Sequence, residues 1–445
     1  MQRLFPIVAA CALASTTIAA AGAAESTDNN ASLRDEVRAL QQNYDRQLQA
    51  LEQRLAQAES RTAPAGNTAF NPSIAAILSG SYRNLSQDPA GYRLQGFAPG
   101  GEETGPGSRS FSLGESELTI SANADHLFKG TLTFSLAGDN SVGVEEAKLE
   151  TLALDYGASA VAGRFLSGLG YLNNQHSHSW DFVDLPLAYQ AFYGGQYRND
   201  GIQLRWLAPL QRMLELGVEA GNGESYPGSQ RNRNGAGAVT GFVRLGDDIG
   251  DAFSWQANGW YQHSRAEQRS FAALNGVEQP LRDAFSGRSA SWGLAAVAKY
   301  SPAGSASRQF KLAGEYLRRR ETGELTYDAD GAALQDGLRS VQSGWYLQAG
   351  YRFADNWRAS LRHDRLDSGN VAIGLVQSGV LAAADFPTYA AFKPRRDSAS
   401  LDYLPSEFSR IRLQYNRDVS QPARVDNQVL LQYTLSLGAH GAHQY

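Results

Sequence analysis

Residues 429–445 have the sequence VLLQYTLSLGAHGAHQY, in which odd-numbered positions are mostly apolar and even-numbered positions mostly polar. A period of two is typical of a β-strand because successive side chains point to opposite faces of a sheet. A last strand of this kind that ends on an aromatic residue, here Tyr445, is typical of an outer-membrane barrel. A water-soluble β-sandwich shows the same alternation with its apolar face turned to a core, so the period alone leaves both architectures open.

Similar runs recur along the chain from about Asn71 onward. Several of them begin or end on Trp or Tyr, as residues of an aromatic girdle do. Examples are SELTISANAD (116–125), GTLTFSLAG (130–138), GIQLRWLAP (201–209), SWGLAAVAKY (291–300), GWYLQAGYRF (344–353) and SRIRLQYNRD (409–418). We count about 16 such strands, an even number inside the range of bacterial barrels. The sequence therefore predicts an all-β chain that forms a transmembrane antiparallel barrel over residues 73–445.

The N-terminus carries an export signal. Residues 1–24 combine Arg3, a short apolar run and A-x-A-like sites near Ala23, which is the layout of a cleaved signal peptide. The only cysteine of the chain, Cys11, lies in this leader, so disulfides do not stabilise the exported protein. Export and a barrel together predict the cell outer membrane as the location. The formal net charge of -5 does not indicate a nucleic-acid partner.

Residues 25–62 are predicted to form a short periplasmic coiled-coil helix. From Leu33 to Ala58, apolar side chains recur at spacings of three and four, which is the seam of a coiled coil. A lone amphipathic helix of this length is marginal in water, so we expect self-association, with a homotrimer as the expected assembly. A helix folded back on the barrel is the alternative. Residues 63–72 contain two prolines and a glycine and are a predicted linker.

Alternation along the strands also predicts which charged side chains face the lumen. Acidic side chains come mainly from early strands and basic ones from later strands. The predicted pore-lining residues are Glu115, Glu117, Asp125, Glu146, Arg205, Arg352, Arg358, Arg362, Arg410 and Arg412. An acidic arc opposite a basic arc would set up a field that filters ions. Pairing of these charges with one another is the alternative, and a one-residue error in register would reverse any single assignment.

The segment 168–200 separates two predicted strands and is too long for a periplasmic turn. It is rich in aromatic residues, and such a loop would be prone to association if it were fully exposed. We therefore expect it to fold into the lumen and to narrow the channel. The residues predicted at this constriction are His176, His178, Trp180, Asp181 and Asp184.

Part of this segment, NNQHSHSWDFVDLP at 173–186, also has the composition of a metal site. Imidazole and carboxylate groups are zinc ligands, so His176, His178 and Asp181 are a candidate transient zinc site. The alternative is a polar loop that hydrogen bonds to the barrel wall. No other cofactor is expected.

The residues also carry a family resemblance. EEAKLETLALDYGASAVAGRF (145–165), a long loop and DGIQLRW (200–206) are together similar to phosphate-selective porins, which are trimeric 16-stranded barrels with an inward-folded third loop. GESELTISANAD (114–125), HSHSWDFVDLPL (176–187), LPSEFSRIRLQYNRD (404–418) and QYTLSLGAHGAH (432–443) resemble proteobacterial outer-membrane barrels often labelled zinc-regulated outer-membrane proteins, or loosely TonB-dependent receptors. The resemblance covers nearly the whole chain after Asn71. Because a short helix and linker precede the barrel, we expect no receptor plug.

These features predict a porin-like channel for passive diffusion of small polar or charged solutes, with a divalent-metal (zinc) preference as a further hypothesis. The expected partners are membrane lipid, other copies of the chain and the solutes themselves. A structural or tethering role for the coiled coil is one alternative. A barrel enzyme is another, but Ser177 and Ser179 are adjacent to His178 in an extended loop and cannot form a nucleophile–base pair with it. We therefore expect no enzymatic activity.

Overall fold

A computed structural model of the protein describes residues 72–101, 103–138, 141–152, 154–302 and 308–438. The chain divides into two compact units, Met1–Ala69 and Phe70–Tyr445, and only the second contains described residues. The predicted signal peptide, the predicted coiled coil and the linker up to residue 71 therefore lie outside the described residues. So do residues 439–445 of the C-terminal motif.

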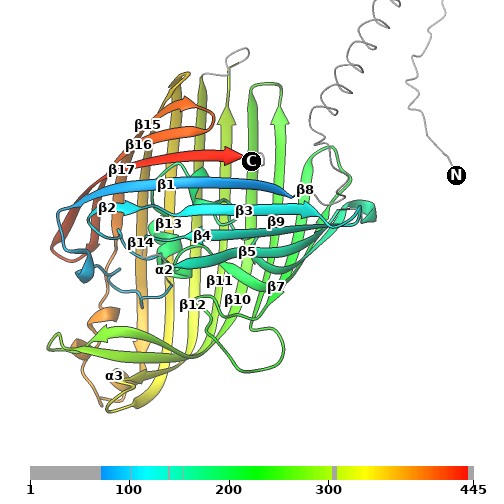
Figure 1. Ribbon diagram of the computed structural model, residues 1–445. Helices are drawn as coiled ribbons and strands as arrows, with labels where there is room; N and C mark the ends of the chain where they lie inside the picture. Colours follow the sequence, from blue (N-terminus) through cyan, green and yellow to red (C-terminus); the bar gives the residue numbers. More distant parts are fainter. Residues whose placement is uncertain (1–71, 102, 139–140, 153, 303–307, 439–445) are drawn as a thin grey trace, which may run out of the picture. The chain divides into compact units, whose positions relative to one another are not determined.

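The second unit is a single antiparallel sheet (Figure 1). Its strands are β1 (Ser73–Leu85), β2 (Ser110–Leu113), β3 (Ser116–Asn123), β4 (Phe128–Leu136), β5 (Val142–Thr151), β6 (Ala158–Leu166), β7 (Arg198–Leu207), β8 (Met213–Gly221), β9 (Ala238–Ile249), β10 (Phe253–Leu274), β11 (Pro280–Tyr300), β12 (Gln309–Tyr327), β13 (Leu334–Ala354), β14 (Trp357–Ile373), β15 (Arg395–Ser406), β16 (Ser409–Gln421) and β17 (Arg424–Gly438). The helical elements are η1 (Pro89–Gly91), η2 (Asp155–Gly157), η3 (Ser177–Ser179), α2 (Leu187–Tyr193), α3 (Gly374–Gln377), η4 (Ala383–Asp385) and η5 (Pro387–Tyr389).

The sheet closes into a barrel because its last strand returns to the first. From β3 onward each strand pairs with the next, and β17 pairs with β1, with Ala75 opposite Gly438. Strands β2 and β3 both pair with β1, so the 17 strands fill 16 positions around the barrel. This confirms the predicted transmembrane antiparallel barrel of about 16 strands. Among the described residues, no helix combines the length and apolar character needed to cross a membrane.

The two faces of the barrel wall differ in polarity, and this difference excludes the β-sandwich alternative. In β17, Leu431 and Tyr433 are about half exposed, whereas Gln428 is buried. In β12, Leu312 points outward while Glu315 points inward and is buried. An apolar outer face around a polar interior is the reverse of a water-soluble protein and is the arrangement of a membrane barrel.

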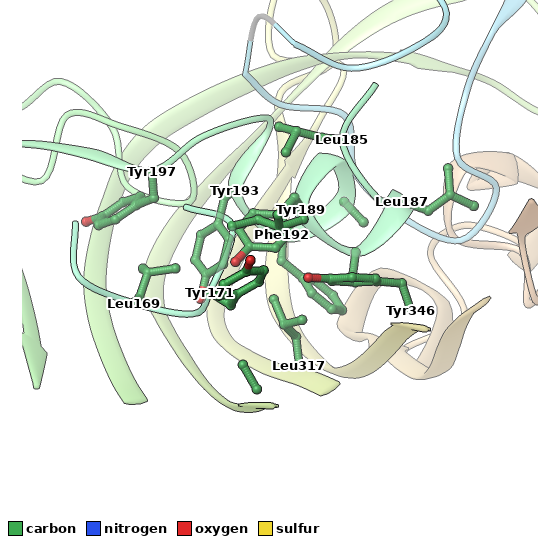
Figure 2. Close-up of a cluster of buried hydrophobic side chains, with 14 of the residues drawn as sticks. Leu169, Tyr171, Leu185, Leu187, Tyr189, Phe192, Tyr193, Tyr197, Leu317 and Tyr346 are labelled. Carbon is green, nitrogen blue, oxygen red and sulfur yellow. The ribbon is translucent and has the colours of Figure 1, made fainter. Parts of the chain in front are cut away.

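The apolar core of this protein lies inside the barrel. The chain between β6 and β7, residues 167–197, enters the lumen and carries α2 with it (Figure 1). Leu187, Tyr189 and Phe192 of α2 are fully buried. Figure 2 shows them packed with Leu317 of β12 and Tyr346 of β13. The predicted loop 168–200 therefore folds inward, but it ends earlier than expected because β7 begins at Arg198.

A second loop, residues 86–109 between β1 and β2, packs against this inserted segment. Phe97 contacts Phe192 edge to face, with ring centroids 5.9 Å apart, and the Glu103 amide donates to the Gly194 carbonyl at 3.0 Å. Gly194 ends α2 with a φ of 65°. A Cβ atom at Gly194 would lie 2.4 Å from the Gly100 carbonyl oxygen, so this contact requires glycine for its space as well as for its backbone conformation.

Candidate functional site

Glu315, on the inner face of β12, anchors the aromatic part of the inserted loop. Its carboxylate accepts hydrogen bonds from the Tyr189 hydroxyl at 3.0 Å and from the Tyr346 hydroxyl at 2.6 Å. The Leu172 amide donates to it at 3.1 Å. A buried carboxylate must have its hydrogen-bonding capacity satisfied. Two of these donors, Leu172 and Tyr189, belong to the inserted loop and therefore attach it to β12 of the wall.

Asp181 and Asp184 attach the next part of the loop to the basic side of the barrel. Asp181 accepts from Lys311 at 2.6 Å and from Arg358 at 3.0 Å. Burial opposes ionisation of Asp181, but these two cations hold its pKa well below the usual range. The carboxylate therefore stays charged and paired at neutral pH.

Asp184 is held in the same way by a different pair of cations. It accepts from Arg362 at 3.0 Å and also pairs with Arg396. Gln414 donates a further hydrogen bond at 2.7 Å. Burial opposes ionisation, yet Arg362 and Arg396 lower the pKa of Asp184 to about 2. Both aspartates are therefore anchors that fix the loop across the lumen.

His176 and His178 lie on the other side of the loop, against acidic residues of β3 and β5. His176 Nδ1 is 3.2 Å from Glu145 Oε2 and 3.4 Å from Glu117 Oε2, and its Nε2 is 3.4 Å from Glu146 Oε2. Burial disfavours the imidazolium, but Glu145 and Glu146 raise the pKa of His176 well above its ordinary value. Without a metal, this side chain is therefore a cation that bridges carboxylates.

His178 completes the arrangement. Its Nδ1 lies 3.0 Å from Glu117 Oε1, and its ring stacks on that of His176 with centroids 5.7 Å apart and planes 13° apart. Ser177 donates to the same Glu117 oxygen at 3.3 Å. Arg410 donates to the His178 carbonyl at 2.9 Å. The His-Ser-His stretch is thus held between the acidic and the basic parts of the wall.

Three cavities surround this stretch. The largest, about 360 Å³, is lined on the acidic side by residues that include Glu117, Glu146 and Arg205. The second, about 280 Å³, is lined by four cationic side chains, Lys299, Lys311, Arg358 and Arg410. The third, about 250 Å³, is lined by Arg83, Glu115 and Asp184 among others. His178 contributes to the lining of all three, so the cavities adjoin at this residue.

The structure brings most of the predicted lumen charges to this region. Glu115, Glu117, Glu146, Arg205, Arg358 and Arg410 line the cavities. Arg362 and Arg412 are buried in ion pairs with Asp364 and Asp402. Many of these charges also pair with one another, as Arg205 does with Glu150. The wall therefore has an acidic and a basic side, and many charges on each side also form ion pairs with a neighbour.

Two predicted lumen residues, Asp125 and Arg352, do not line these three cavities. Asp125 is in the exposed turn after β3, where its carboxylate accepts from the Leu127 and Phe128 amides at 2.7 and 2.9 Å. The lumen prediction for Asp125 is wrong because β3 ends at Asn123, so the alternation of its side chains does not reach Asp125. Arg352, near the end of β13, keeps the inward direction of alternation, because its neighbours Tyr351 and Phe353 are exposed on the outer face. Its guanidinium donates to the Asp355 carbonyl in the following turn at 3.1 Å.

The predicted zinc ligand set also needs correction. Asp181 faces Lys311 and Arg358, away from the histidines, and cations in contact with it oppose metal binding. Glu145 stands in its place near His176. Sequence reasoning missed Glu145 because the pairing of β4 with β5 shifts between Thr133 and Phe134. This bulge turns both Glu145 and Glu146 to the interior, where strict alternation allows only one.

Comparison with known proteins supports the architecture. No family model matches the chain. An uncharacterized protein of Aquifex aeolicus is 29% identical over 410 residues, and the match covers 86% of this chain and 82% of that protein. The outer membrane channel DcaP of Acinetobacter baumannii has a TM-score of 0.52 at 14% identity, covering 84% of this chain and 99% of that one.

Two further solved structures are similar to this barrel. An anion-selective porin from Comamonas acidovorans has a TM-score of 0.51 at 10% identity, covering 83% of this chain and 100% of that chain. The chain has the porin fold. OmpT, an outer membrane protein of Vibrio cholerae solved in a trimer form, has the same TM-score, identity and coverage. The structural similarity establishes the fold, but sequence identities this low do not identify the solute.

Proposed function

We propose that this protein is an outer-membrane channel through which small polar or charged solutes diffuse passively. The observation that carries the proposal is the position of His178, which lines three charged cavities at once. The aromatic cluster around Tyr189 and Phe192 fills another part of the lumen. Solutes are thereby directed along the polar edge of the inserted loop, past fixed charges of both signs.

Three finer features belong to the same proposal. The apolar outer face of the barrel supports an outer-membrane location. A trimer is supported by the trimer form of the Vibrio cholerae protein with the same fold and by the coiled-coil pattern of residues 25–62. A divalent-metal preference, and with it the zinc-regulated label, is supported by the acidic wall around His176.

The proposal is tested in planar lipid bilayers with the purified full-length chain. We expect stepwise conductance, and a protein that inserts without any conductance would overturn the channel. His178→Ala removes the ring at which the cavities adjoin, so we expect a larger single-channel conductance. His263→Ala is the matched control, because His263 lies on β10 and does not line any of the three cavities. An equal change in both variants would contradict the role of His178.

A further inference from the structure

The acidic side of the constriction has the chemistry of a divalent-metal site. Three carboxylates, from Glu117, Glu145 and Glu146, surround the single imidazole of His176 within 3.4 Å. One ligand atom from each of Glu117, Glu145 and His176 falls in a group whose members all lie within 4.8 Å of one another. We propose that these three side chains bind a divalent transition-metal cation, with Zn²⁺ as the best match.

The two spacings that involve His176 agree with zinc. Tetrahedral zinc with bonds of about 2.0 Å places its ligand atoms roughly 3.3 Å apart. His176 Nδ1 lies 3.2 Å from Glu145 Oε2 and 3.4 Å from Glu117 Oε2. The group as a whole spans up to 4.8 Å, so an ion that binds between these atoms draws the two carboxylates closer together. It would take the place of the ring proton, because metal binding requires the neutral imidazole.

The charge around the site attracts a cation. Glu115 hydrogen bonds to Glu145, which adds a fourth carboxyl group to Glu117, Glu145 and Glu146. The nearby cations are Lys148, 2.6 Å from Glu146, and Arg198, 3.8 Å from Glu145. A hydrogen bond between two carboxyl groups needs a proton, so the four groups together carry three negative charges. When the metal displaces the His176 proton, these three charges exceed the two cations by one. A nitrogen donor beside carboxylate oxygens favours zinc and similar metals over Ca²⁺ or Mg²⁺.

The surrounding residues supply support and access. His178 Nδ1 and the Ser177 hydroxyl both contact Glu117 Oε1, which leaves Oε2 for the metal and fixes the carboxylate as outer-shell partners do. His176 and Glu117 line the cavity of about 360 Å³, so water can enter and complete the coordination. Three protein ligands with an open position suit an ion that must also leave, as a channel requires.

The site itself stands on geometry, and only its consequence for conduction rests on the proposed channel. Isothermal titration of the full chain in detergent with ZnCl₂ tests it. We expect one saturable Zn²⁺ per chain. His176→Ala and Glu145→Gln should each weaken binding more than about tenfold. Glu150→Gln is the matched control, because Glu150 lines the same cavity on the same strand but lies outside the ligand group, and it should keep wild-type affinity.

Two results would overturn the site: no saturable binding by the wild-type chain, or wild-type affinity in both ligand variants. Zinc X-ray absorption of the wild-type protein covers the case in which a variant does not fold. Scattering from one imidazole supports the site, and an oxygen-only shell overturns it. Conductance measured in chelator separates the two proposals. A conducting protein that binds no zinc overturns the metal site alone, whereas a zinc-binding protein that does not conduct supports the site and overturns the channel.

Discussion

The attachment of the inserted loop to the basic wall can be weakened by one substitution, Asp184→Asn. The two arginines that contact Asp184 keep other partners in the variant, since Arg362 also pairs with Asp364 and Arg396 with Asp418. The wall network therefore survives, and the change acts mainly on the loop. What is lost is the charge-assisted part of the contact.

The size of the effect follows from the pKa of Asp184. It falls from 3.8 to about 2, and each unit corresponds to about 1.4 kcal/mol of differential interaction. The carboxylate should therefore stabilise the docked loop by roughly 2 to 3 kcal/mol at neutral pH. Loss of this stabilisation should raise the population of the undocked loop by roughly 30- to 150-fold.

Hydrogen exchange of the backbone amides of residues 167–197 measures this opening. At pH 7 the variant should exchange faster than wild type in this segment. Because the folded pKa lies below the unfolded one, the stabilisation is complete above about pH 4 and is lost as the pH falls toward 2. The two proteins should therefore converge in acid. Asp330→Asn, in an exposed ion pair with Arg282, is the control and should change little. At pH 2 about half of Asp184 is still ionised, so roughly a twofold difference remains. Equal exchange of Asp184→Asn and wild type at pH 7, or a difference at pH 2 as large as that at pH 7, would refute the reasoning.

Two other substitutions test different parts of the constriction. Phe192→Ala removes a fully buried ring of the lumen cluster, so it should cost about 3–5 kcal/mol of loop docking; the same exchange measurement checks it, and unchanged protection would show that the cluster does not hold the loop. Arg410→Ala removes a cation from the cavity of about 280 Å³, so the reversal potential in a KCl gradient should move toward cation selectivity. A move toward anion selectivity would contradict the assigned sign of this wall.

The barrel could be predicted from the sequence because its pattern is local. Each strand alternates with a period of two, and the alternation of residues such as Leu431 and Tyr433 with polar neighbours follows from the pleat alone. The inward direction of the long loop was also predictable, since its aromatic residues need burial. The partners inside the lumen were not, because contacts such as Tyr189 with Glu315 join residues distant in the sequence, and no local pattern encodes them.

The proposed metal ligands show most clearly where strand alternation fails to predict the direction of a side chain. Alternation correctly turns Glu117 and Glu146 inward, but it assigns Glu145 to the lipid face, where a carboxylate would be costly. In a regular strand the adjacent residues Glu145 and Glu146 point to opposite faces, so one of the two carboxylates would face lipid. A bulge in the β4–β5 pairing avoids this cost because it turns both side chains to the interior. Paired acids in a membrane strand are therefore a usable sequence signal for such a bulge. In this chain the bulge places a third carboxylate within reach of His176, and this carboxylate completes the ligand group of Glu117, Glu145 and His176.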